Sequence, residues 1–204
     1  LQQYFGSSES RAHAMGAAYA FGSREYERDP AIAAEINAIN KEIYENNNPF
    51  APIHGIYRMG RQWSMDYFDA MYERLGTAFD FYFFESESAP AGKKIVEEGL
   101  AKNIFETGEG GAVIFRGENH GLHTRVFLNS GGLPTYEAKE LGLAQIKRGK
   151  YPYDLSITVT GNEVTDYFRV VRKAMEVLWG DAFVKALKHI PHGMLRLPEG
   201  KMSS

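Results

Sequence analysis

The stretch DLSITVT, residues 154–160, is followed by Gly161 and Asn162 and then by an amphipathic run over residues 163–178. The apolar and β-branched side chains of the first stretch predict a buried strand, and the Gly-Asn pair predicts a turn. Four apolar residues of the following run recur at helical spacing and are expected to face inward: Val164, Phe168, Val171 and Met175. A strand that ends in a small-residue turn before a helix is typical of nucleotide-binding α/β sheets.

The first part of the chain has a helical pattern. Residues 7–27 predict one helix, and Asp29 followed by Pro30 predicts the start of a second, with an apolar stripe at Ile32, Ile36, Ile39 and Ile43. Residues 61–75 predict a third helix that ends at Gly76. Its apolar residues are expected to be buried: Trp63, Tyr67, Phe68, Met71 and Leu75.

The middle of the chain mixes short elements. The aromatic run FDFYFFE at residues 79–85 predicts a buried strand, and residues 93–102 a short helix. Residues 112–116 and 124–128 predict a β-hairpin with a loop at 117–123. That loop contains His120 and His123, whose spacing suits a metal only if they are helical; without a third ligand nearby, solvated histidines are favoured.

After residue 131 the pattern changes to alternating strands and helices, and residues 183–190 are expected to form a short helix or strand. We therefore predict an α/β fold in two parts. Residues 1–130 form a helical and hairpin-bearing region, and residues 131–204 form an α/β region with parallel strands.

Composition sets limits on partners and location. The 204 residues are 44% hydrophobic and carry a net charge of −3, so no global basic surface indicates a nucleic-acid partner. There are no cysteines, which excludes disulfides and is consistent with a reducing cytoplasm. No apolar run approaches the roughly 20 residues of a membrane helix, and no signal-peptide pattern opens the chain. We expect a cytoplasmic protein with no membrane partner.

The last residues, HGMLRLPEGKMSS from His192 to Ser204, carry a distinctive motif. KMSS resembles the mobile lysine loop, usually written KMSKS, of class I aminoacyl-tRNA synthetases. Four such residues alone are also compatible with a surface turn. The longer form LPEGKMSS, preceded by HxxxGM over residues 189–194, resembles arginyl-tRNA synthetases.

Two further segments carry the same resemblance, GGLPTYEAKELGLA at residues 131–144 and ITVTGNEVTDYF at 157–168. The resemblance implies that Tyr136 and Glu140, one helical turn apart, hold the guanidinium of arginine, for which a carboxylate and an aromatic ring are suitable partners. It assigns Glu163 to the same substrate, although Glu163 also suits a first-turn acid at a helix start. The family usually has aspartate at position 140 and glutamine at position 163.

The resemblance also implies an ATP site at the end of the chain, with Mg²⁺ entering with ATP. Lys201 would be the catalytic contact to the phosphates, helped by Met202, Ser203 and Ser204. His189, Gly193 and Met194 would line the adenine pocket. No resident metal is expected.

The implied activity is that of arginine–tRNA ligase, which joins arginine to tRNA(Arg) through arginyl-adenylate. The chain begins at Leu1 and lacks the family's other signature, HxGH; His54 and Gly55 are followed by Ile56 and Tyr57. We therefore expect a fragment that holds the second half of a Rossmann-like catalytic fold with an insertion region, is inactive alone, and contacts tRNA mainly through other segments. The alternatives are a non-catalytic interaction module derived from a synthetase, or a fragment of another class I synthetase.

Overall fold

A computed structural model describes residues 7–45, 48, 50–193, 196–197 and 200–201. The chain divides into two compact units, Leu1–Phe81 and Tyr82–Ser203. Helices and small sheets together make an α/β structure. In the part of the chain that is described, no helix is both long and apolar enough to cross a bilayer.

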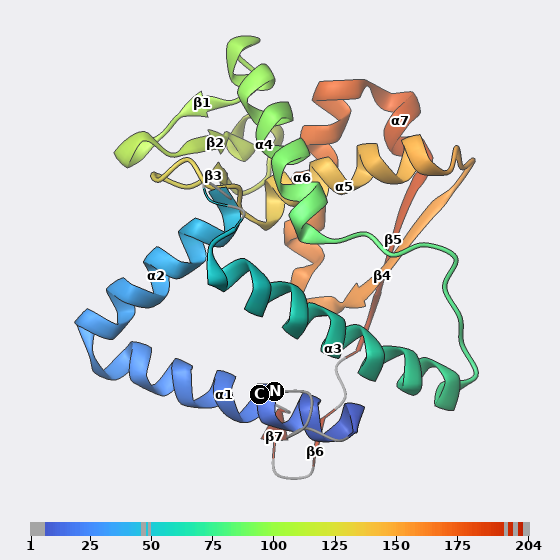
Figure 1. Ribbon diagram of the computed structural model, residues 1–204. Helices are drawn as coiled ribbons and strands as arrows, with labels where there is room; N and C mark the ends of the chain where they lie inside the picture. The colour runs from blue at the N-terminus through green and yellow to red at the C-terminus, as the bar shows by residue number, and fades with distance from the viewer. Residues whose placement is uncertain (1–6, 46–47, 49, 194–195, 198–199, 202–204) are drawn as a thin grey trace. The chain divides into compact units, whose positions relative to one another are not determined.

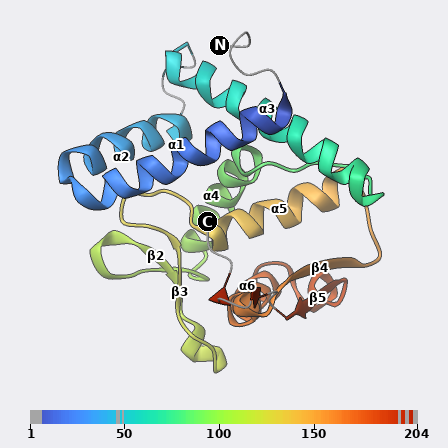
Figure 2. The ribbon, with the colours of Figure 1, turned by 90° about the horizontal axis from the view of Figure 1, so that it is seen from below.

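The described part of the first unit is made of helices α1 (Ser8–Arg28), α2 (Pro30–Glu45) and α3 (Pro52–Leu75), with α1 alongside α2 (Figure 2). The predicted ends of these helices are largely confirmed. A side-chain oxygen of Asp29 accepts a hydrogen bond from the amide of Ala31 at 2.8 Å, which is a helix cap. Gly76 ends α3 in the left-handed conformation, with φ of 66°.

The third helix differs from the prediction in its start and in its buried face. It begins at Pro52 rather than at residue 61, because proline suits the first position of a helix. Trp63 is buried, and the guanidinium of Arg11 lies 5.5 Å from the centre of its ring. Phe68 and Leu75 are 45% and 76% exposed, so the expectation that both are buried is wrong.

The aromatic run at residues 79–85 is not a strand. Residues 77–84 lie outside any helix or strand, and Glu85 already begins the next helix. Phe79 is 52% exposed and meets Tyr72 edge to face, with ring centres 4.7 Å apart. Aromatic side chains favour a strand only where a neighbouring strand pairs with it, and the ring of Phe79 makes a local contact instead.

The second unit contains four helices in its described part, α4 (Glu85–Ala101), α5 (Tyr136–Lys150), α6 (Thr165–Trp179) and α7 (Asp181–Lys185), as Figure 1 shows. Its strands are β1 (Glu106–Thr107), β2 (Val113–Phe115), β3 (Arg125–Leu128), β4 (Ser156–Gly161), β5 (Leu187–His192), β6 (Arg196–Leu197) and β7 (Gly200–Lys201). Short 3₁₀ turns are η1 (Glu109–Gly111), η2 (Gly117–His120) and η3 (Asn162–Val164).

Helices α4 and α5 pack with their backbones in close approach. A Cβ added at Gly142 of α5 would lie 2.1 Å from the carbonyl oxygen of Ser88, and one at Gly92 of α4 would lie 1.9 Å from that of Ala138. Glycine at both positions is therefore required by the packing. The core continues from this contact into fully buried side chains of the neighbouring elements: Val96, Phe105, Phe115, Phe127, Leu141, Val170 and Val171.

The predicted hairpin is confirmed as part of a small antiparallel sheet in the order β1-β2-β3. Its connecting loop contains η2, and His120 stacks on Phe115 with ring centres 5.4 Å apart. Among the described residues no group of three His, Cys, Asp or Glu side chains is placed to hold a metal ion.

Strands β4 and β5 pair in parallel, from Ser156 opposite Leu187 to Gly161 opposite His192. The predicted strand–turn–helix is therefore present, with η3 as the turn between β4 and α6. The expectation of a fully buried strand is wrong, since Ile157 and Val159 are 51% and 61% exposed. The alternate residues of β4 are half-buried, so one face of this two-stranded sheet packs on the helices and the other is open.

Candidate functional site

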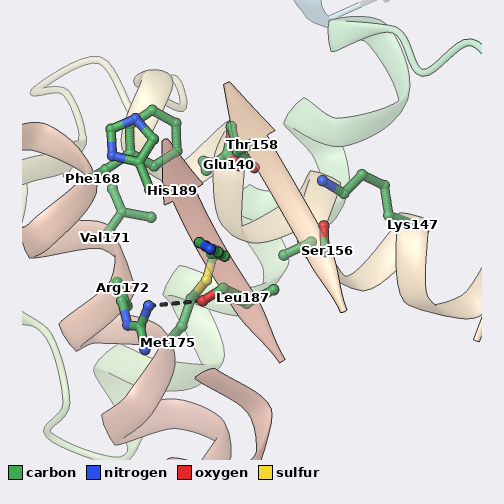
Figure 3. Close-up of a pocket in the computed structure, with 12 residues that line it drawn as sticks. Glu140, Lys147, Ser156, Thr158, Phe168, Val171, Arg172, Met175, Leu187 and His189 are labelled. Atoms are coloured by element: carbon green, nitrogen blue, oxygen red, sulfur yellow. Dashed lines mark hydrogen bonds between the residues drawn. The ribbon is translucent and has the colours of Figure 1, made fainter. Parts of the chain in front are cut away.

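A pocket lies between β4 and β5 on one side and α5 and α6 on the other (Figure 3). It contains about 470 Å³ of empty space, part of it open to solvent. The apolar part of its wall includes Ala144, Phe168, Val171, Met175 and Leu187. Its polar lining is Glu140, Lys147, Ser156, Thr158, Arg172, Lys188 and His189. Two residues predicted from the sequence, Glu140 and His189, are thus brought to one cavity from segments far apart in the chain.

Glu140 is the single acidic residue among the pocket's lining residues. It lies in the second turn of α5, and its side chain is half-buried. Burial raises the pKa of its carboxyl group, and the positive charge of Lys147 opposes this shift. A carboxylate in apolar surroundings is poorly solvated, so this group would gain from a cationic ligand that hydrogen bonds to it.

Tyr136 is the first residue of α5 and precedes Glu140 by four residues, so the two occupy the same side of the helix. Its ring is 70% exposed, and the ammonium nitrogen of Lys139 lies 5.0 Å from the ring centre. Lys139 is also paired with Glu85 of α4, at 2.7 Å between Nζ and Oε2. Tyr136 itself does not line the pocket.

The first turn of α5 is tied to α6 by Tyr167. The hydroxyl group of Tyr167 donates a hydrogen bond to the carbonyl oxygen of Tyr136 at 2.9 Å. Burial, followed by the negative charges of Glu140 and Glu137, raises the pKa of this phenol well above its usual range, which keeps it a donor. No role of Tyr167 could be predicted from the sequence, because nothing in its local pattern indicates a contact with a residue 31 positions earlier.

Glu163 lies in η3, directly after β4 and before α6, and its side chain is exposed. It is outside the pocket's lining. The turn itself is held by the hydroxyl group of Thr165, which donates to the carbonyl oxygen of Asn162 at 2.8 Å. Both interpretations of Glu163, a substrate contact and an acid at a helix start, stay predictions.

His189 lies in β5, where its ring stacks on Phe168 of α6 with centres 4.2 Å apart. The hydroxyl group of Thr160 donates to the carbonyl oxygen of Gly161 at 3.0 Å. The same oxygen lies 2.7 Å from Nε2 of His189, and when the hydroxyl proton is donated to Gly161, Nε2 is the donor of this second bond. Burial lowers the pKa of His189. His189 lines the same pocket as Glu140, and a contact with adenine stays a prediction.

The remaining predicted ATP contacts follow β5. Gly193 is exposed, and a Cβ there would meet no atom within 4 Å. Nδ1 of the exposed His192 lies 2.8 Å from the carbonyl oxygen of Gly193. Lys201 pairs with Arg196 across the β6–β7 ladder. Met194, Met202, Ser203 and Ser204 lie outside the described residues.

Proteins of known function are similar in sequence to this chain. No protein-family model matches the chain. The arginine–tRNA ligase of Porphyromonas gingivalis is 36% identical over 149 residues, which are 73% of this chain and 25% of that protein. The arginine–tRNA ligase of Bacteroides fragilis is 34% identical over 155 residues, 74% of this chain and 25% of that protein. The chain thus spans about a quarter of the length of these relatives.

A solved structure agrees at the level of the fold. The arginyl-tRNA synthetase of Plasmodium falciparum superimposes with a TM-score of 0.63 at 18% identity, covering 74% of this chain and 26% of that one. The similarity of sequence to the two bacterial ligases extends over nearly three quarters of the chain. The chain belongs to the arginyl-tRNA synthetase family.

Proposed function

We propose that this chain is a segment of an arginine–tRNA ligase that activates arginine with ATP and transfers it to tRNA(Arg). Activation would form arginyl-adenylate and release pyrophosphate, and transfer would place arginine on the 3′ end of the tRNA. The observation that carries the proposal is the pocket in which Glu140 is the single acidic residue of the lining and burial raises the pKa of its carboxyl group. Membership of the synthetase family supports a guanidinium as the partner of this carboxyl group.

In this proposal residues 131–204 are the second half of a Rossmann-like nucleotide fold, and residues 1–130 are its insertion region. The parallel pairing of β4 with β5 supports this, because nucleotide folds are built on parallel strands. Among the described residues β4 pairs with β5 alone, which leaves its other edge available for a further parallel strand. The exposed Ile157 and Val159 suit burial by the rest of such a fold.

Arginine would be held by Tyr136, Glu140 and Glu163. Glu140 would accept hydrogen bonds from the guanidinium, for which a carboxylate is the strongest partner in proteins. The exposed ring of Tyr136, one turn earlier, would cover one face of the planar cation. Glu163, at the carboxyl end of β4, would meet the substrate from the strand edge where α/β folds place their ligands.

ATP would lie beside β5, with His189, Gly193 and Met194 around the adenine. Gly193 has the open surroundings that a close approach between ligand and backbone needs. Lys201, with Met202, Ser203 and Ser204, would neutralise the charge that develops on the phosphates as pyrophosphate leaves. Mg²⁺ would enter with ATP as part of the substrate. The natural location would be the cytoplasm, and tRNA would be bound mainly by segments outside this sequence.

Arginine-dependent exchange of radioactive pyrophosphate into ATP tests this function. The protein to assay is the natural gene product that carries this sequence, with each of the other amino acids as a control. Exchange that depends on arginine supports the proposal. Exchange that depends on a different amino acid would assign the protein to another synthetase, and no exchange with any amino acid, with or without tRNA, would leave a non-catalytic module.

A further inference from the structure

The hydroxyl group of Tyr167 donates its hydrogen bond to the carbonyl oxygen of Tyr136, which already accepts a hydrogen bond within α5. Because Tyr136 opens α5, helix geometry pairs its carbonyl oxygen with the amide of Glu140, four residues later. A carbonyl oxygen has two lone pairs, so the phenol at 2.9 Å occupies the second. The start of α5, which carries both proposed guanidinium contacts, is therefore tied to α6 by this hydroxyl group, while the ion pair of Lys139 with Glu85 ties it to α4.

The ring of Tyr167 connects the same turn with the pocket wall. It meets Phe168 edge to face, with ring centres 5.0 Å apart and planes at 89°. Phe168 in turn stacks on His189 and lines the pocket. Tyr167 thus contacts both the first turn of α5 and the aromatic pair of Phe168 and His189 that lines the cavity.

The position of Tyr167 in the chain also relates the two segments that carry the proposed arginine contacts. It is the third residue of α6, which begins directly after η3 and its residue Glu163. The proposed arginine contacts come from two segments, the start of α5 and the β4–α6 turn. A hydrogen bond from the start of α6 to the start of α5 fixes how far apart these two segments can lie.

We propose that Tyr167 is a positioning residue for arginine, holding the turn with Tyr136 and Glu140 in register with the start of α6. This inference rests on the proposed function and names a residue that the family resemblance did not single out. Without the hydroxyl group, the start of α5 keeps its helical bonds and its ion pair with α4 but loses its hydrogen bond to α6. Arginine would then meet Glu140 and Tyr136 in a less suitable geometry, and loss of one such restraint weakens binding.

The test is Tyr167→Phe in the natural gene product, with pyrophosphate exchange measured against both arginine and ATP. We expect the KM for arginine to rise about three- to tenfold, the range that one lost hydrogen bond gives, with the KM for ATP within about twofold. The matched control is Tyr153→Phe, which removes the hydroxyl group of a phenol whose ring centre lies 6.0 Å from the guanidinium carbon of Arg148, near the opposite end of α5. This control should change neither constant.

The results of these assays distinguish the positioning role of Tyr167 from the proposed function. An unchanged KM for arginine in Tyr167→Phe, or equal increases in both KM values, would overturn the positioning role. The thermal midpoint of each variant, with assays run well below it, identifies a general loss of structure. A wild-type protein without arginine-dependent exchange would overturn the proposed function instead, and the positioning role with it.

Discussion

Nε2 of His189 lies 2.7 Å from the hydroxyl oxygen of Thr160, across the parallel ladder between β5 and β4. The same imidazole stacks on Phe168 of α6. One side chain therefore joins the end of β4, its neighbouring strand and the helix that follows β4. The contacts of His189 therefore tie the end of β4, just before the turn with Glu163, to β5 and α6.

The state of His189 predicts a pH dependence of stability. Because burial lowers its pKa, the folded chain disfavours the protonated ring, and the unfolded chain binds that proton more readily. Its contribution to stability is therefore present above about 6.5, the ordinary histidine value, and is lost as the pH falls through the folded-state pKa. An NMR titration of the His189 ring should give a pKa below 6.5, and His189→Gln should flatten the acid limb of the unfolding free energy. A pKa at or above 6.5 would contradict this.

Loss of the charge at Glu140 and at Glu137 of α5 should change the stability of the fold in opposite directions. The raised pKa of Glu140 means that its ionisation destabilises the fold, a cost that appears as the pH rises through the folded-state pKa. Glu140→Gln should therefore raise the thermal midpoint at neutral pH. Glu137 is buried and pairs with Arg125 at 3.5 Å, so Glu137→Gln should cost about 1–2 kcal/mol. Thermal unfolding of both variants at pH 7.5 checks this, and equal midpoints would refute it.

The close contact between α4 and α5 predicts that alanine at one glycine of α5 lowers the stability of the fold strongly, whereas alanine at another glycine raises it. Gly142→Ala places a methyl group 2.1 Å from the carbonyl oxygen of Ser88, so the helices must move apart, at a cost of about 3 kcal/mol or more. Gly149 lies in the last turn of the same helix with no atom within 4 Å of an added Cβ. Gly149→Ala should stabilise by up to about 1 kcal/mol, because alanine favours the helix. Urea unfolding of both variants measures the difference, and a harmless Gly142→Ala would disprove the close packing.

The 204-residue chain by itself should not catalyse arginine-dependent pyrophosphate exchange. Its sequence has no HxGH segment, and loss of a donor to the transition state commonly costs about 10²–10³ in rate. Arginine should bind through Glu140 no more tightly than about 1 mM, because the pocket is partly open to water. Exchange assays and calorimetry on the purified chain check both statements. Clear exchange activity would mean that the missing signature is not needed.

Elements with a strong local pattern could be predicted from the sequence. The run from β4 through η3 to α6 has a clear change of period from strand to helix, and its parallel partner β5 overlaps residues 183–190, which were expected to form a helix or strand. Val171 and Met175 are buried as the helical spacing requires. Caps such as Asp29 and Gly76 act within one turn of the chain, so sequence alone is enough to find them.

Features that depend on distant neighbours could not be predicted. The aromatic residues at 79–84 have strand-forming side chains but no strand. Helix α4 begins at Glu85 rather than at residue 93 and contains Pro90, a residue that usually marks a helix start or end. The hydroxyl of Tyr167 and the carbonyl of Tyr136 are 31 residues apart. No local pattern encodes their contact, although both residues lie in segments on which the family resemblance rests.

The most direct test of the account is arginine activation by the natural gene product with a single change at Glu140. Glu140→Gln keeps the size of the side chain but removes the charge that the guanidinium needs, so kcat/KM for arginine should fall at least about a hundredfold. Glu140→Asp restores a carboxylate, the residue usual in the family at this position, and should stay within about tenfold of wild type. ATP binding should persist in both. Arginine kinetics unchanged in Glu140→Gln would show that the guanidinium is held elsewhere and would contradict the assignment of this pocket.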